Sequence, residues 1–237
     1  MPLRIFKLRS LTASSVVRGL TFAAMFAVFF FGALYLEKVL GYAPLRTGIA
    51  FLPMTLAMAV MSLGLTSRLL IRFGPMKLLV PGMSAAIIGL LLLSQTPVHA
   101  NYFVSILPAF LLLGMGMSIS AVPLLTIAMA DVPKNDAGLA SGIVNVSMWL
   151  ASSIGLAIFG TLAASKTTSL VGEGQSQASA LVAGYHVTFL IGAILAAMGL
   201  IVTLALLRAP AKGVVEAQAS PSLESEMEHG DVFAAEF

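Results

Sequence analysis

A chain of 237 residues is long enough for one or two soluble domains, yet 59% of it is hydrophobic, only 10% is charged and its mean hydropathy is +1.00. A soluble protein cannot bury that much apolar surface, whereas a membrane protein can turn it toward lipid. The formal net charge is +3, but the Lys and Arg residues are scattered singly or in pairs, which excludes a nucleic-acid-binding patch. There is no cysteine, which excludes disulfides and Cys-ligated metals.

Six apolar segments approach or exceed the length of about 20 residues that a helix needs to cross a bilayer. The apolar runs are continuous rather than alternating, which favours helices over a β-barrel. The sequence therefore predicts an all-α membrane protein, a bundle of six transmembrane helices. The predicted spans are residues 16–36, 47–67, 78–94, 103–127, 137–163 and 185–207.

The predicted domain organisation has three parts. A basic segment, 1–15, precedes the transmembrane domain at 16–207, and a tail follows at 208–237. Beyond Lys212 the tail contains acidic residues spread among Ala, Ser, Pro and Gly, which predicts a disordered acidic segment. The polar stretch 165–183 is predicted to be a flexible loop between the last two spans.

The distribution of basic residues predicts the orientation in the membrane, because Lys and Arg are retained on the cytoplasmic side. Three basic residues, Lys38, Arg46 and Lys166, fall on one side of the six spans and ten on the other. Both termini are therefore predicted to be cytoplasmic, in a protein of the plasma (inner) membrane. The ten are Arg4, Lys7, Arg9, Arg18, Arg68, Arg72, Lys77, Lys134, Arg208 and Lys212.

Several chemistries are absent from the predicted spans. No acidic residue lies between Lys38 and Asp131 or between Asp136 and Glu173, so none of these spans contains a carboxylate that could carry a proton. A phosphate-binding glycine-rich loop and a hydrolytic triad are also absent, which argues against an ATP-driven pump or a membrane protease. The three histidines are far apart in sequence. We expect no metal, no cofactor and no enzymatic activity.

The fourth predicted span carries a run of small residues. Gly114, Gly116, Ser118 and Ser120 recur at every second position, which allows neighbouring helices to approach closely. Pro123 follows and is expected to kink or break the helix. Two interpretations stay open: ordinary tight packing, or a flexing helix that lines a transport path.

Three segments resemble one known family. The fifth span opens with GLASGIVNVS at 138–147, which includes the packing candidates Gly138 and Gly142, and resembles the fifth helix in the C-terminal half of the fourteen-helix drug:proton antiporters of the major facilitator superfamily. The segment 40–53, LGYAPLRTGIAFLP, is similar to the signature between the first two helices of that half. The loop RFGPMK, with Arg72, Gly74 and Lys77, resembles the cytoplasmic loop motif of the superfamily. The matches keep their order, and the resemblance covers about residues 15–208.

This resemblance implies one half of the transporter fold, a 3+3 inverted repeat, with substrate held between two halves and with the first and fourth helices lining the cavity. The sequence departs from the family in two places. Ile71 stands where the family commonly has Asp, and Met148 and Trp149 stand where many relatives have an Arg-Gln pair. The second change removes an intramembrane charge and favours neutral or aromatic ligands.

Aromatic, methionine and amide side chains are the candidates for contact with substrate, since polarizable side chains suit varied apolar ligands. Ordinary packing is the alternative for each of them, and for the amide it is a hydrogen bond between helices. Arg18 is expected to extend toward the cytoplasmic surface. The candidates are Phe22, Phe26, Met115, Met117, Asn145, Met148 and Trp149.

The resemblance thus implies part of an efflux transporter for hydrophobic or amphipathic compounds, which works by alternating access and proton exchange. Its expected partners are the lipid bilayer, a small substrate, and either the missing N-terminal half or a second copy. A metabolite permease, a truncated fragment and a non-transporting membrane scaffold remain as alternatives. The small number of polar groups in the spans argues against a permease for charged or hydroxyl-rich substrates.

Overall fold

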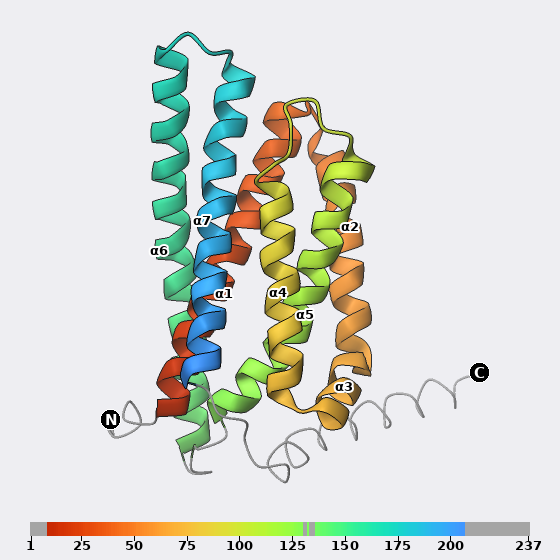
Figure 1. The fold of residues 1–237 in the computed structure, drawn as a ribbon, viewed down its shortest axis with the longest axis vertical. Helices are drawn as coiled ribbons and strands as arrows, with labels where there is room; N and C mark the ends of the chain where they lie inside the picture. The colour runs from red at the N-terminus through yellow and green to blue at the C-terminus, as the bar shows by residue number, and fades with distance from the viewer. Residues whose placement is uncertain (1–8, 130–131, 133–135, 207–237) are drawn as a thin grey trace, which may run out of the picture.

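A computed structural model of the chain describes residues 9–129, 132 and 136–206, and every regular element in these ranges is a helix (Figure 1). Three of the elements are single π-helical turns, labelled η, that continue or precede an α-helix. In chain order the elements are α1 (Arg9–Leu34), η2 (Tyr35–Val39), α2 (Pro44–Val60), η3 (Met61–Leu65), α3 (Thr66–Phe73), α4 (Pro75–Leu93), η4 (Tyr102–Ile106), α5 (Leu107–Met129), α6 (Ala137–Gly172) and α7 (Gln177–Leu206).

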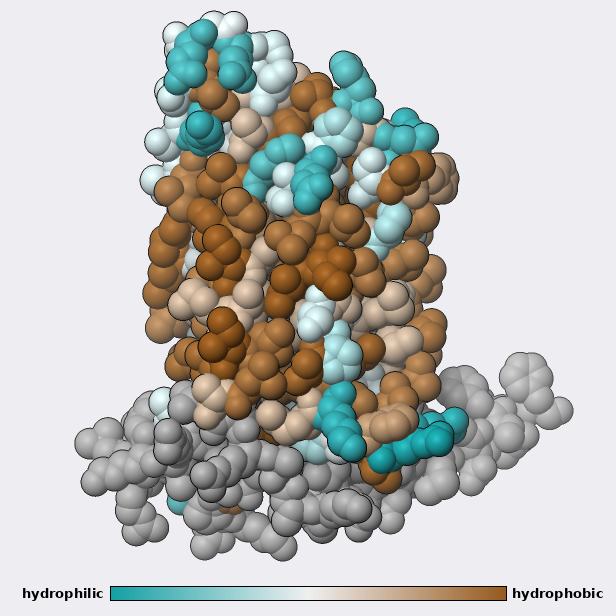
Figure 2. Space-filling model, in the orientation of Figure 1, coloured by the Kyte–Doolittle hydropathy of each residue, from teal (hydrophilic) through white to brown (hydrophobic). Residues whose placement is uncertain are grey.

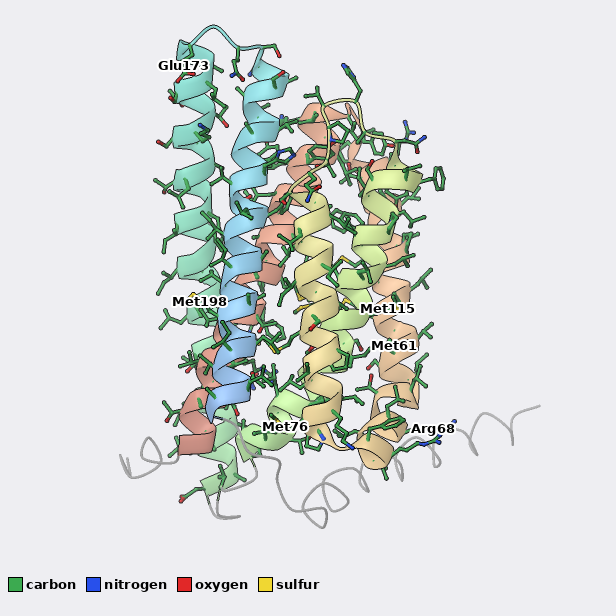
Figure 3. The ribbon with its side chains drawn as sticks, in the orientation of Figure 1. Met61, Arg68, Met76, Met115, Glu173 and Met198 are labelled. Atoms are coloured by element: carbon green, nitrogen blue, oxygen red, sulfur yellow. The ribbon has the colours of Figure 1, made fainter. Side chains whose placement is uncertain are left out.

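The structure confirms the six-span prediction within the described ranges. On the face drawn in Figure 2, hydrophobic residues cover the middle of the bundle and hydrophilic residues gather toward its ends. In Figure 3 one end carries Arg68 and the other carries Glu173. We call the first the basic end, because α1 begins there and Arg68, Arg72 and Lys77 are exposed there. The six helices long and apolar enough to cross a membrane are Leu11–Val39, Pro44–Leu63, Pro75–Leu93, Tyr102–Met129, Ala137–Gly172 and Gln177–Ala205.

The boundaries differ from the predicted ones in three places. The predicted loop at 165–183 is wrong, because α6 continues to Gly172 and α7 begins at Gln177. The first span continues to Val39 and so includes Glu37 at its end, which makes the predicted absence of any carboxylate from the spans wrong at this position. The helix α1 begins at Arg9, inside the segment assigned as 1–15, and the predicted acidic tail, 208–237, lies outside the described residues.

Polar composition explains the error at 165–183. The Ser, Thr and Lys residues there remain compatible with helix, so polarity marks the place where the helices leave the apolar belt rather than a loop. Glycine and proline shape the two turns that precede α2 and α4. Gly41 and Gly74 have φ of 69° and 81°, a conformation that favours glycine. Pro44 and Pro75 then begin α2 and α4.

The helices pack as two related groups of three. In the first group α1 packs on α6 and α7, and in the second α5 packs on α2 and α4. Two further contacts, α1 with α5 and α4 with α7, join corresponding helices of the two groups, and α6 also packs on α7 within the first group. Exchanging α1 with α5, α2 with α6 and α4 with α7 therefore reproduces each of these helix pairs except that of α6 with α7. Because α1 and α5 run in opposite directions, this is the pattern of a 3+3 inverted repeat.

The burial of the spans is uneven. In the most apolar stretch of each span, 61% of α5 with η4 and 56% of α1 are buried, against 17% of α2 and 22% of α6. The centre of the bundle is therefore formed by α1 and α5, and α2 and α6 flank it with large apolar surfaces exposed. Leu56 and Leu63 on the α2 span and Ile154 and Ile158 on α6 are each at least half exposed.

Candidate substrate pathway

A groove of about 370 Å³ lies between α1, α2 and α5. Its walls are mostly apolar, and the residues that contribute hydroxyl groups are two serines. The helices that form it are the first, second and fourth spans, so it includes both helices that the family resemblance implies for the lining of the cavity. The lining residues are Phe22, Met25, Met58, Ala59, Ser62, Met117, Ser118, Ala121 and Val122.

One face of α1 forms the first wall. Phe22, Met25 and Phe29 are separated by four or fewer residues in the helical pattern i, i+3, i+7, so their side chains share a face. Phe29 continues beyond the groove and stacks on Phe51 of α2 at 5.5 Å between ring centroids. Phe51 in turn stacks on Phe110 of α5 at 4.7 Å. These three rings join α1, α2 and α5 on the side of the groove away from the basic end.

Residues of the second span form a wall that the sequence patterns did not predict. Met58 and Ser62 occupy successive turns, and Ser62 lies in the π-helical turn η3. The hydroxyl of Ser118 on α5 donates to the Met58 carbonyl at 3.2 Å and ties the two helices together beside the groove. A possible signal was the methionine spacing in the second span, Met54 and Met58, which places two thioethers on one side of the helix.

The two candidate methionines of the fourth span are separated by the structure. Met117 lines the groove and is buried. Met115, which Figure 3 labels at mid-height, is partly buried and is not among the lining residues. Residues two apart on a helix point about 200° away from each other, so the two methionines cannot occupy one wall. The structure thus brings together Phe22 and Met117, but not Met115.

The candidates on α6 also fall into two environments. Trp149 is 56% exposed, and its ring meets that of Phe26 on α1 edge-on, with centroids 5.5 Å apart. Met148, by contrast, is buried in the packing of α6. Asn145 is exposed, and no hydrogen bond of its side chain is found within the described ranges. Phe26 and Trp149 therefore form a pair beside the groove, and Asn145 lies one turn from Trp149.

Glycine positions show which small residues serve packing inside this chain. A Cβ on Gly114 would lie 2.5 Å from the Met54 carbonyl oxygen, and one on Gly116 would lie 2.6 Å from the Gly82 carbonyl oxygen. These two glycines let α5 approach α2 and α4. A Cβ at Gly138 or Gly142 would meet nothing within 4 Å. The helix α5 also continues through Pro123 without a break.

The residues of the loop motif lie at the basic end. Arg72 is exposed in the last turn of α3, with its guanidinium carbon 5.4 Å from the Phe73 ring centroid. Gly74 forms the turn, and its N–H donates to the Leu70 carbonyl at 2.8 Å. Lys77 is exposed in the first turn of α4. The loop therefore joins α3 and α4 tightly and displays two positive charges to the surroundings.

Arg18 is less exposed than a side chain that extends fully to the surface. Its Nε and Nη1 atoms are buried without a hydrogen-bond partner, and its guanidinium carbon lies 5.3 Å from the Phe22 ring centroid. The hydroxyl oxygens of Ser14 and Ser15, in the preceding turn, are also buried without a partner. The sequence does not predict this cluster, because Ser and Arg residues are common near helix ends and only the structure shows that these side chains are buried without partners.

A model of the Major Facilitator Superfamily matches residues 2–156. The chain belongs to the major facilitator superfamily. It is thus an integral, multi-pass membrane protein of a transporter family, in agreement with its six apolar helices.

Three relatives illustrate the similarity. The chain is 33% identical over 173 residues to the puromycin resistance protein pur8 of Streptomyces alboniger, an alignment that covers 72% of this chain and 34% of that protein. It is 30% identical over 164 residues to the multidrug resistance protein Stp of Mycobacterium tuberculosis, covering 69% and 30%. It is 28% identical over 179 residues to the tetracenomycin C resistance and export protein of Streptomyces glaucescens, covering 76% and 33%. The aligned part of the chain spans about a third of the length of these relatives.

Proposed function

We propose that this chain forms the C-terminal six-helix half of an exporter for hydrophobic or amphipathic compounds, which it moves by alternating access in exchange for protons. The observation that supports this most directly is the groove between α1, α2 and α5. Its lining combines an aromatic ring, Phe22, with the thioethers of Met25, Met58 and Met117. Thioether side chains are flexible and polarizable, so they adapt to apolar ligands of different shape. The names of the relatives, which describe resistance and export, support the same assignment.

The second half of the exporter would cover the exposed faces of α2 and α6. These faces carry large apolar side chains, among them Leu56 and Ile158, on helices that are mostly unburied here. The relatives are about three times as long as the matched region, which leaves room for the missing helices. The other half is either the N-terminal part of the same transporter or a second copy. Closing the groove between two halves would hold a substrate near the bilayer midplane.

We place the basic end in the cytoplasm and assign the protein to the inner membrane, with both termini inside. The exposed Arg68, Arg72 and Lys77 support this, because basic loops are retained on the cytoplasmic side. The turn between α6 and α7 provides a test, since the chain has no native cysteine. A Glu173→Cys variant should react with a membrane-impermeant maleimide added outside intact cells. Reaction only after the cells are opened would reverse the orientation.

Proton exchange requires a group whose protonation differs between the two access states. In the described spans the acidic side chain is Glu37, at the end of the first span and far from the groove. We therefore assign the coupling carboxylate to the other half of the transporter. The chain alone, reconstituted in liposomes with a pH gradient, should not accumulate a fluorescent cationic substrate. Gradient-driven accumulation by this chain alone would contradict the assignment.

Protection from labelling tests the groove itself. Ser62 lines the groove and is exposed, whereas its neighbour Leu63 is 79% exposed and does not line it. In single-cysteine variants of the assembled transporter, puromycin should slow maleimide labelling at Ser62→Cys and leave Leu63→Cys unaffected. A non-transporting scaffold would show no protection at either position. Equal protection at both would indicate a general change of conformation instead of a ligand in the groove.

A further inference from the structure

Arg18 is a charged group inside the first span that has no counterion in the described part of the chain. It lies nine residues beyond the start of α1 at Arg9, which is about 13 Å of helix at 1.5 Å per residue. Its Nε and Nη1 atoms are buried and make no hydrogen bond. An arginine side chain stays protonated, and an unpaired charge inside a membrane protein is strongly destabilising. A partner is therefore expected for this guanidinium.

Two further hydrogen-bond donors lie beside it. Ser14 and Ser15 are 1% and 8% exposed, and their hydroxyls have no partner. Buried hydroxyls elsewhere in the bundle usually donate to the carbonyl four residues earlier, as Thr21 does to Val17 at 2.8 Å. Ser14 and Ser15 precede Arg18 by four and three positions, so each of them adjoins Arg18 on the surface of α1. The two serines point about 100° apart, and Ser15 also lines a groove between α1 and α6. The cluster offers several N–H and O–H donors to one anion.

No carboxylate of the described chain reaches this cluster. Gly19 lies against Ala151 and Gly155 against Ala23, so α1 and α6 run parallel at the same level. Asp136 precedes Ala151 by 15 residues, about 22 Å of helix. Glu37 follows Arg18 by 19 residues, about 28 Å. The described part of the chain therefore supplies no anion to this cluster.

The cluster continues directly into the groove. Arg18, Phe22, Met25 and Phe29 recur at i, i+4, i+7 and i+11, which places them along one face of α1. The Arg18 guanidinium lies over the Phe22 ring, and Phe22 and Met25 line the groove. Along α1, the positive charge of Arg18 is thus followed by the apolar groove wall formed by Phe22 and Met25.

We propose that Arg18, Ser14 and Ser15 bind the carboxylate of an amphipathic transported compound whose apolar body lies along Phe22 and Met25. This inference rests on the proposed export function and adds amphipathic carboxylates to the compounds that the groove would bind. A transported anion with an apolar body satisfies both the charge and the groove. A carboxylate side chain from the other half of the transporter would satisfy the charge alone, and a lipid headgroup would direct its acyl chains into the bilayer.

Three aromatic compounds of equal size but different charge test the assignment: naphthalene-2-carboxylate, 2-naphthamide and 2-naphthylmethylammonium. The full chain is placed in phosphatidylcholine nanodiscs, and the dissociation constants are measured by titration calorimetry. The carboxylate should bind at least about tenfold more tightly than the amide, and the ammonium compound most weakly. Arg18→Gln should remove the advantage of the carboxylate and leave amide binding unchanged, which also shows that the variant is folded. Arg68→Gln, which removes an exposed charge on α3, should preserve the advantage.

Three results would overturn the assignment. Equal binding of carboxylate and amide by the unmodified chain would refute the anion site. It would not affect the proposed groove or the proposed export function. Loss of the advantage when phosphatidylglycerol replaces part of the phosphatidylcholine would identify the headgroup of an anionic lipid as the ligand of Arg18. Failure of all three compounds to bind would count against the groove itself, and so against the proposed function as well.

Discussion

The fourth and fifth spans, α5 and α6, carry similar runs of small residues in opposite surroundings. In α5, Gly114 and Gly116 lie directly against α2 and α4, and a Cβ on either would come within 2.6 Å of a backbone oxygen. In α6, Gly138 and Gly142 face open space. The most apolar stretches of the two spans are 61% and 22% buried respectively. The same residue type therefore marks a completed helix contact in α5 and an exposed surface at Gly138 and Gly142 of α6, whereas Gly155 farther along α6 lies against Ala23 of α1.

The difference shows what small residues determine in a membrane protein. They allow a close approach between helices, but the approach needs a partner whose shape fits. The described chain supplies such partners for α5 on two sides, whereas α6 packs mainly on α1 and α7 and makes only a small contact with α5. The open face of α6 is consistent with a surface that the second half of the transporter covers.

The largest expected change in stability is at a glycine of α5. Gly116→Ala would place a Cβ 2.6 Å from the Gly82 carbonyl oxygen and 2.7 Å from the Ala86 nitrogen, so the backbones of α4 and α5 must separate. Overpacking of this kind costs about 1–3 kcal/mol in the free energy of unfolding. We expect a lower midpoint of thermal unfolding and a smaller monodisperse peak in size-exclusion chromatography.

Gly142→Ala is the matched control on α6. Nothing lies within 4 Å of its Cβ position, and alanine favours a helix over glycine by about 1 kcal/mol. The unfolding midpoint of the isolated chain should stay the same or rise. Comparable losses of stability in both variants would show that the two regions are packed alike.

A smaller effect on stability, with a larger effect on export, is expected at the pair formed by Phe26 and Trp149. An edge-on aromatic pair contributes about 0.5–1.5 kcal/mol, and Trp149 is 56% exposed, so Trp149→Ala should change stability little. In the assembled transporter it should change the relative resistance of cells to different compounds more than the amount of protein. Leu150→Ala, 59% exposed on the same helix, is the control and should leave the resistance pattern unchanged. A fall in protein amount with an unchanged pattern would assign Trp149 to packing alone.

Asn145 gives a parallel test with no expected stability cost. Its side chain is exposed and makes no hydrogen bond in the described ranges, so Asn145→Ala should not change the unfolding midpoint of the isolated chain. In the assembled transporter the amide becomes available to substrate or to the other half. We expect a changed export profile in cells. A lower unfolding midpoint of the isolated chain would show an interaction within this half.

A small loss of stability is expected when the hydrogen bond between α5 and α2 is removed. Ser118→Ala removes the 3.2 Å contact to the Met58 carbonyl beside the groove. Hydrogen bonds between membrane helices contribute about 0.6 kcal/mol on average, so the unfolding midpoint should fall only slightly. Ser153→Ala, whose hydroxyl bonds the Trp149 carbonyl on its own helix, is the control and should change the midpoint less. A loss of several kcal/mol for Ser118→Ala would mean that the groove is held together mainly by this bond.

Much of the fold and part of the site could be predicted from residue patterns. The number of spans followed from apolar length, and Phe22 and Met117 were found among the groove residues. The wall formed by Met58 and Ser62 was not found, because the spacing of Met54 and Met58 does not by itself distinguish a groove face from a lipid face in an apolar span. Met115 was assigned to the same cavity as Met117, although helix geometry places the two on different sides.

The sequence by itself determined the six spans, the basic end and the family, because hydrophobic length, charge placement and short motifs are local properties of the chain. The tertiary structure alone decided how each helix is rotated, and with it the environment of each side chain. In lipid both faces of a helix can be apolar, so the rotation is set by packing against neighbouring helices. For this reason the isolation of Arg18, the groove on α2 and the contrast between the glycines of α5 and α6 emerged only from the packed bundle.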